Sequence, residues 1–170
     1  MDADDWIPDN AINIMVQHAE ETNADVVEGG MTRVLGRHKF AKHFHAKTYK
    51  EITTPELFDD YFISFFGVNI LSVNLCGKIF KKELFQNPDL KPSGFKMGED
   101  LILSMRIFPS ISKYLVIEEN VYFYRYGGGT SRYNPNMYSD LKSQYYIKLD
   151  AIKKYKYAKA LRTTKIEMCN

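Results

Sequence analysis

The sequence predicts an α/β fold in a single domain that spans residues 1–170. Segments with apolar residues at helical spacing alternate along the chain with short apolar runs that are typical of strands. One helical segment, 101–108, is apolar nearly all round, which indicates a helix buried against other elements. The chain has 170 residues, of which 45% are hydrophobic, and this is enough for one domain with a substantial core.

The first elements are expected to be a helix and a short strand. Asp9 can cap a helix that continues to Asn23. Its apolar face is formed by residues at spacings of three and four, namely Ile12, Met15, Val16 and Ala19. The apolar run 24–29 predicts a strand that ends at the glycine pair Gly29–Gly30.

The middle of the chain alternates in the same way. Segments 31–35 and 39–45 are expected to form a hairpin around Gly36. Thr54-Pro55-Glu56 is a helix start, with proline at the first helical position. We expect an extended segment over 72–80 and a short helix over 81–85.

The last third is expected to contain the buried helix 101–108, two strands at 114–117 and 121–126, and a long C-terminal helix after Pro135. The stripe of that last helix comprises Leu141, Tyr145, Leu149 and Ile152.

Bulk composition excludes several classes of protein. The net charge is only +2, so there is no electrostatic case for binding nucleic acid. Two cysteines, Cys76 and Cys169, are too few for a disulfide framework. The sequence contains no apolar run of about 18 residues and no signal-peptide pattern, so a cytoplasmic location is expected.

Carboxylates are dense near the start of the chain, at Asp2, Asp4 and Asp5. Like charges at this density repel one another unless water or a cation screens them. The default interpretation is a solvated acidic segment. The alternative is a site for Mg²⁺ or Mn²⁺, since these hard cations prefer oxygen ligands and can bridge to a phosphate.

A second acidic pair, Glu99 and Asp100, follows Gly98 at the start of the buried helix. Acids in a first helical turn commonly just complement the helix dipole. Here they lie where burial begins, and helix N-terminal N–H groups favour an ionised carboxylate that can act as a general base. Successive helical residues point about 100° apart, so only one of the two faces a given site.

The single residue Lys78 and the basic residues of the C-terminal helix each have two interpretations. Lys78 lies in the apolar run 75–80 and either extends its charge to solvent or acts in a site. The C-terminal helix carries seven basic residues: Lys148, Lys153, Lys154, Lys156, Lys159, Arg162 and Lys165. The default for these is a solvated face, and the alternative is peripheral contact with anionic lipid.

The order of these motifs resembles that of family-2 glycosyltransferases of the GT-A fold, over about residues 1–132. The matching segments are Asp2–Trp6, Ala24–Val27 with Gly29, Gly77–Phe80, Lys82–Phe85, Gly98–Asp100 and Val121–Arg125 with Ser131.

This resemblance implies a GT-A-like mixed sheet with flanking helices. It also implies inverting transfer of a sugar from a nucleotide-sugar donor to a glycan or lipid-linked acceptor, in the synthesis of cell-surface polysaccharide. By position, Asp4 and Asp2 hold Mg²⁺ or Mn²⁺, with Asp5 beside them. Asp100 is the base, with Glu99 beside it.

Trp6, Gly98 and Lys78 are assigned to the substrate side of the site. Because the metal motif opens this sequence, the nucleotide-binding half of that fold is expected to be absent, and no transfer by residues 1–170 alone is expected. The alternative function is a truncated, non-catalytic module that binds a partner or forms a homo-oligomer through an exposed apolar face.

Overall fold

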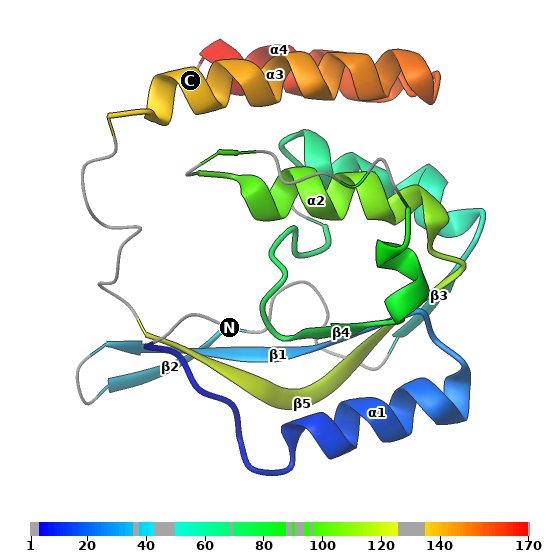
Figure 1. Ribbon diagram of the computed structural model, residues 1–170, viewed down its shortest axis with the longest axis vertical. Coiled ribbons are helices and arrows are strands. Elements are labelled where there is room, and N and C mark those ends of the chain that lie inside the picture. Colours follow the sequence, from blue (N-terminus) through cyan, green and yellow to red (C-terminus); the bar gives the residue numbers. More distant parts are fainter. Residues whose placement is uncertain are drawn as a thin grey trace.

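The computed structural model describes residues 4–35, 38–42, 50–68, 70–87, 90, 94–95, 97–125 and 135–169. A mixed sheet of five strands lies between helices (Figure 1). The strands are β1 (Val26–Leu35), β2 (His38–Lys42), β3 (Lys50–Thr53), β4 (Lys78–Phe80) and β5 (Lys113–Arg125). β1 pairs parallel with β5 and antiparallel with β2 and β4, and β3 pairs antiparallel with β5. The predicted α/β class is confirmed, and so is the predicted hairpin where β1 pairs with β2. Gly36 and residues 43–45 of that prediction lie outside the described residues.

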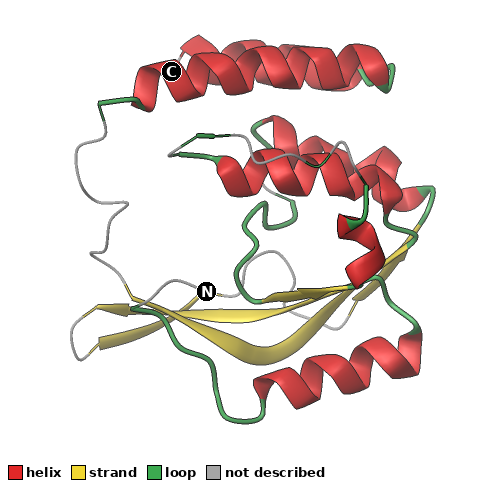
Figure 2. Cartoon of the chain, viewed as in Figure 1, coloured by secondary structure: helices red, strands yellow, loops and turns green. Residues whose placement is uncertain are grey.

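Helices cover both faces of the sheet (Figure 2). α1 (Ala11–Thr22) lies on one face, and α2 (Glu99–Ile107) lies on the other. α3 (Met137–Lys154) and α4 (Leu161–Cys169) pack together as an outer layer beyond α2. The short helical turns are η1 (Leu57–Tyr61), η2 (Phe62–Phe66), η3 (Lys82–Phe85), η4 (Phe108–Ser110) and η6 (Ala158–Ala160).

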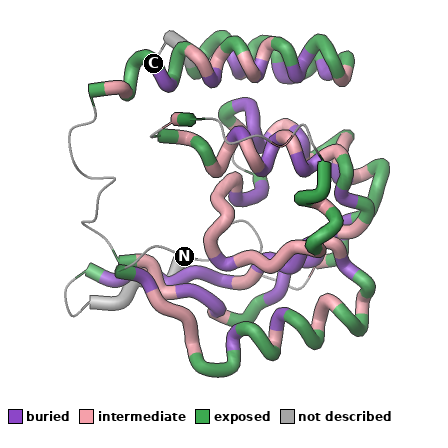
Figure 3. Tube along the Cα trace, viewed as in Figure 1, coloured by how far each residue is buried: buried purple, intermediate pink, exposed green. Residues whose placement is uncertain are grey.

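Alternation along the strands divides the core into two layers. Neighbouring residues of a strand point to opposite faces of the sheet. Val26 and Tyr114 pack in the larger cluster, together with η2 and α2. Val27 and Leu115 pack in the smaller cluster, beneath α1. The buried residues therefore follow the sheet and the sides of the helices that face it (Figure 3).

Both main strands are longer than the sequence predicts. β1 continues through Gly29–Gly30 and does not end there. Glycine is needed at position 29 because a Cβ atom there would lie 2.5 Å from Val121 on the neighbouring strand. The expected link between two strands at 118–120 is instead a bulge inside β5. Its register with β1 shifts there, from Glu28 opposite Val116 to Gly30 opposite Asn120.

Three helical predictions change in detail. α1 has Asn10 rather than Asp9 at its N-cap, and Ile12 and Val16 are 47% and 40% exposed, because the helix faces the sheet with Ala11 and Met15.

The segment after Thr54-Pro55 is helical, but η1 is a π-helical turn and η2 a 3₁₀ turn. The short helix expected at 81–85 is η3, whereas in the extended segment 72–80 only Lys78–Phe80 forms a strand.

The long C-terminal helix is confirmed in α3 but stops at Lys154. Tyr157, which follows, is buried and lies against Phe62 with 5.1 Å between ring centroids, so the chain turns into the aromatic cluster before α4 begins. The predicted basic face is divided between two helices, and Lys148 is buried. Among the helices of the described residues, none has the length and apolar character needed to cross a membrane.

Candidate active site around Asp100

Asp100 lies in the first turn of α2. The turn before it depends on Gly98, whose φ of 79° is in the left-handed region that favours glycine. One carboxylate oxygen of Asp100 accepts a hydrogen bond from the backbone N–H of Leu75, at 3.4 Å. The N–H groups of the first helical turn stabilise a negative charge at this position. Asp100 therefore presents a carboxylate at the start of a helix, where such a group can accept a proton.

A pocket of about 490 Å³ opens beside this turn. Its polar residues are Glu99, Asp100 and Arg106. The remaining lining is Leu75, Phe85, Leu90, Gly94, Phe95, Ile102 and Leu103. A concave, mainly apolar pocket with a few convergent charged groups is typical of a small-molecule site.

Lys78 lies beneath the site and not on its surface. Its side chain is 3% exposed, and its Nζ lies 3.5 Å from the carboxylate of Glu28, which is itself 4% exposed. The same ammonium donates a hydrogen bond to the carbonyl of Ser72, at 2.5 Å. The hydroxyl of Tyr114 donates to Glu28. The interpretation that Lys78 extends its charge to solvent is therefore wrong, because its side chain is buried.

The charges in this network influence one another. Burial lowers the pKa of the Lys78 ammonium, and the carboxylates of Glu28 and Asp100 oppose that shift. Burial and the charge of Glu28 raise the pKa of the Tyr114 hydroxyl. The charges of Lys78 and Asp100 thus influence each other. The segment from Ser72 to Leu75 also links them, because Lys78 donates to the Ser72 carbonyl and the Leu75 N–H donates to Asp100.

The N-terminal motif is anchored to β5. Trp6 pairs with Phe123 through two backbone hydrogen bonds, and the two rings stack 5.1 Å apart. Asp5 is buried, and its two carboxylate oxygens accept hydrogen bonds from the Tyr122 hydroxyl (2.8 Å) and the Arg125 backbone N–H (2.7 Å).

Asp4 is exposed, and its carbonyl accepts a hydrogen bond from Arg125 Nε, at 3.1 Å. Asp2 lies outside the described residues.

These positions bear directly on the predicted metal. Asp5 already uses both carboxylate oxygens in hydrogen bonds, and Asp4 is the remaining described carboxylate of the motif. Over the described part of the chain, no group of three or more His, Cys, Asp or Glu side chains lies together. The assignment of Mg²⁺ or Mn²⁺ to Asp2 and Asp4 stays a prediction.

The structure connects the two acidic motifs through side chains between them. Tyr122 is hydrogen-bonded to both Asp5 and Cys76, and burial together with these neighbours raises its pKa. Cys76 in turn lies near Lys78 in the network beneath Asp100. Sequence reasoning singled out Lys78 and missed Glu28. Glu28 could have been found in the sequence, because it is a carboxylate within the apolar run 24–29 and can pair with a buried lysine.

Asp25 contacts the residues at the start of β5 and just after the end of β4, and it directly precedes β1. Its carboxylate accepts hydrogen bonds from the backbone N–H groups of Ser112 (2.8 Å) and Lys113 (3.1 Å) and lies 2.8 Å from Lys81 Nζ. Partial burial opposes ionisation, but these hydrogen bonds outweigh it, so the pKa of Asp25 is lower than the ordinary value of 3.8 for an aspartate. Ionised Asp25 therefore stabilises the folded state.

We expect Asp25→Asn to reduce the free energy of unfolding at pH 7 by about 2 kcal/mol, the usual range for losing charged hydrogen bonds. Because the folded pKa is the lower one, the contribution is present above the unfolded pKa of 3.8 and is lost as pH falls through the folded value. Urea unfolding of both proteins from pH 7 to pH 3 measures this. The two stability curves should converge in acid, and a constant separation would contradict the role of the charge.

Comparison with known proteins supports the fold. No family model matches the sequence, and no curated protein matches it. The structure does match that of S. aureus TarS residues 1–349 in complex with UDP-GlcNAc, with a TM-score of 0.63 and 19% identity over 86% of this chain and 41% of that chain. The same region of TarS in complex with UDP gives a TM-score of 0.60, and TarS 1–349 alone gives 0.59, both at 19% identity with 86% of this chain covered.

These matches define the class of fold. The chain has a mixed α/β sheet with flanking helices that resembles part of the GT-A fold of TarS. It spans 41% of the TarS chain in that match. The predicted GT-A resemblance is confirmed at the level of the fold, whereas membership of family 2 and the placement of its motifs stay predictions.

Proposed function

We propose that this chain is the catalytic, acceptor-side part of a glycosyltransferase whose donor is a nucleotide sugar of the UDP-GlcNAc type. The observation that carries this proposal is the fold match to TarS in complex with UDP-GlcNAc, at a TM-score of 0.63 over 86% of the chain. The position of Asp100, beside a pocket and in a helical first turn, supports it independently.

In the proposed inverting reaction, a hydroxyl oxygen of the acceptor attacks the anomeric carbon of the donor sugar. The bond from that carbon to the β-phosphate oxygen breaks, and UDP leaves with the electron pair. The hydroxyl proton passes to the carboxylate of Asp100, which acts as the general base.

The pocket beside Asp100 suits a carbohydrate acceptor. Phe85 and Phe95 offer apolar surface for the C–H faces of a sugar ring, and Arg106 supplies a cation for an anionic group on the acceptor. A lipid-linked sugar phosphate or an anionic glycan has both features. The further parts of the proposal are family 2, cell-surface polysaccharide synthesis at the inner face of the membrane, and Mg²⁺ or Mn²⁺ on Asp2 and Asp4.

Donor binding tests the proposal. In a protein in which this chain is joined to a nucleotide-binding half, we expect saturable binding of UDP-GlcNAc in a calorimetric titration, stronger with Mn²⁺ than with EDTA, and displacement by UDP. In ¹⁵N-labelled protein, the amide signals of Leu75, Glu99 and Asp100 should shift on addition of UDP-GlcNAc with Mg²⁺. Equal shifts with ADP, or no shift with UDP-GlcNAc, would count against the proposed donor.

The metal assignment has its own control. Asp4→Ala should remove the difference between Mn²⁺ and EDTA, because the proposed ligand is lost. An unchanged dependence on Mn²⁺ would exclude Asp4 as a ligand and would leave the donor proposal standing.

A further inference from the structure

The residues at the start of α2 do not by themselves fix the orientation of its first turn. Its N-cap, Gly98, provides no side-chain hydrogen bond to the first turn. Glycine also has the widest range of backbone angles, so the peptide that precedes it can adopt several orientations. Glu99 and Asp100 follow immediately. The direction of the Asp100 side chain therefore depends on what holds the peptide bond between Met97 and Gly98.

Gln144 of α3 holds that peptide bond. Its side-chain Nε2–H donates a hydrogen bond of 2.7 Å to the carbonyl oxygen of Met97. Gln144 is 6% exposed, so little water competes for this contact. A Cβ atom at Gly98 would lie only 2.4 Å from Nε2 of Gln144. The missing side chain at Gly98 is thus what lets the amide reach the backbone.

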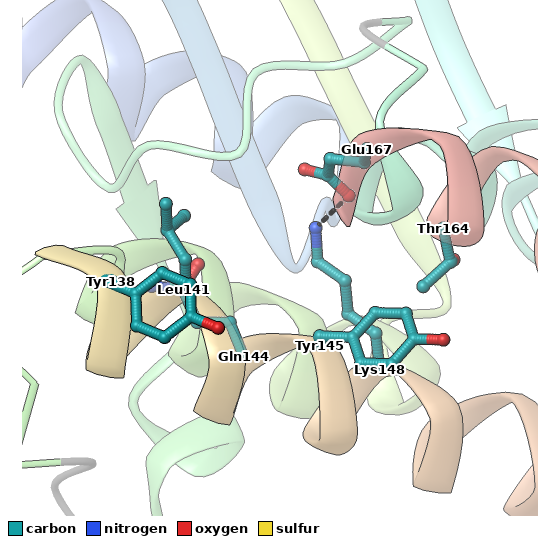
Figure 4. A pocket seen from close by; sticks show the side chains of 7 residues that line it. All are labelled: Tyr138, Leu141, Gln144, Tyr145, Lys148, Thr164 and Glu167. Atoms are coloured by element: carbon teal, nitrogen blue, oxygen red, sulfur yellow. Dashed lines mark hydrogen bonds and ion pairs between the residues drawn. The ribbon is translucent and has the colours of Figure 1, made fainter. Parts of the chain in front are cut away.

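α3 is itself fixed in position. Lys148 lies one turn after Gln144 and its Nζ is 2.6 Å from a carboxylate oxygen of Glu167 on α4. The Lys148 side chain is 4% exposed. Figure 4 shows this ion pair beside Gln144, with Lys148 extended from α3 toward α4. Gln144 therefore projects from a helix that is ion-paired to its neighbour.

We propose that Gln144 is a positioning residue for Asp100. By holding the carbonyl of Met97, it fixes the turn at Gly98 and hence the direction in which the Asp100 carboxylate leaves α2. Since that carboxylate accepts a hydrogen bond from Leu75 N–H, a change at Gln144 should reach Leu75 on a separate segment. The catalytic consequence rests on the proposed function, whereas the coupling between Gln144 and Leu75 does not.

Amide hydrogen exchange and chemical shifts of the whole chain test this coupling. Gln144→Met keeps the length of the side chain and removes the donor. At pH 7 it should lower the protection factor of the Ile102 amide, which bonds to the Gly98 carbonyl at 3.2 Å, by at least tenfold. The Leu75 amide signal should move as well. Protection of Leu115 in the buried centre of β5 should stay within twofold.

Two further variants make the result specific. Gln17→Met, on the opposite face of the sheet, should change neither Ile102 nor Leu75. Gln144→Glu should behave like Gln144→Met at pH 7, but acid that protonates the introduced carboxyl restores a donor to Met97. Protection of Ile102 should then return to within threefold of the wild type at the same pH, and Gln144→Met should show no such recovery.

The proposal is overturned if Gln144→Met leaves Ile102 and Leu75 unchanged, if Leu115 loses protection equally, or if acid fails to restore Gln144→Glu. If the exchange pattern is as expected but UDP-GlcNAc does not bind, only the proposed function is overturned.

Discussion

Asp100→Asn is expected to lower the rate of sugar transfer by about 10²–10⁴-fold, the usual contribution of a general base. An amide keeps the size of the side chain but cannot take the proton of the attacking hydroxyl. Donor affinity should be nearly unchanged, because only an interaction of the transition state is lost. The measurement is release of UDP from UDP-GlcNAc, by a protein in which this chain is joined to a nucleotide-binding half.

Glu99→Gln is the matched control, since it makes the same chemical change one residue earlier on the same helical turn. Its effect should be small, because successive helical residues point in different directions. If Glu99→Gln lost turnover and Asp100→Asn kept it, the two roles would have to be exchanged. If both variants kept turnover, a base in this turn would be excluded.

Lys78→Met should produce the largest loss of stability. The substitution leaves the carboxylate of Glu28 buried without its cation and removes the hydrogen bond to the Ser72 carbonyl. Removing one partner of a buried ion pair costs about 3–5 kcal/mol of the free energy of unfolding. Denaturant unfolding at pH 7 measures this directly, through the midpoint and slope of the transition.

Two comparisons separate the buried pair from a general effect of losing a lysine. Lys50→Met removes the cation of an ion pair with Glu56 whose two side chains are more than 40% exposed, and it should cost at most about 1 kcal/mol. Adding Glu28→Gln to Lys78→Met should recover much of the loss, since no unpaired charge is then buried. Equal costs for Lys78→Met and Lys50→Met would show that Lys78 is not held as described.

Local patterns in the sequence correctly predicted the types of most elements. Apolar spacing predicted α1, the buried α2 and the start of the C-terminal helices, because a helix must bury one stripe of side chains wherever it packs. The acidic first turn of α2 was also predicted, because Glu99 and Asp100 directly precede that apolar segment. The ends of strands were predicted less well, since the bulge in β5 and the passage of β1 through Gly29 depend on how the two strands approach each other.

The tertiary structure alone decided how the candidate site is held together. Asp5 is anchored by Tyr122, which lies 117 residues later in the sequence, and Gln144 reaches back 47 residues to Met97. The pairing of Lys78 with Glu28 likewise depends on the antiparallel register of β4 with β1. The sequence by itself determined which side chains carry charge and which segments form helices or strands, because these follow from residue type and local period. Which charges meet is set by the packing of distant segments, and a single sequence carries no local signal of that packing.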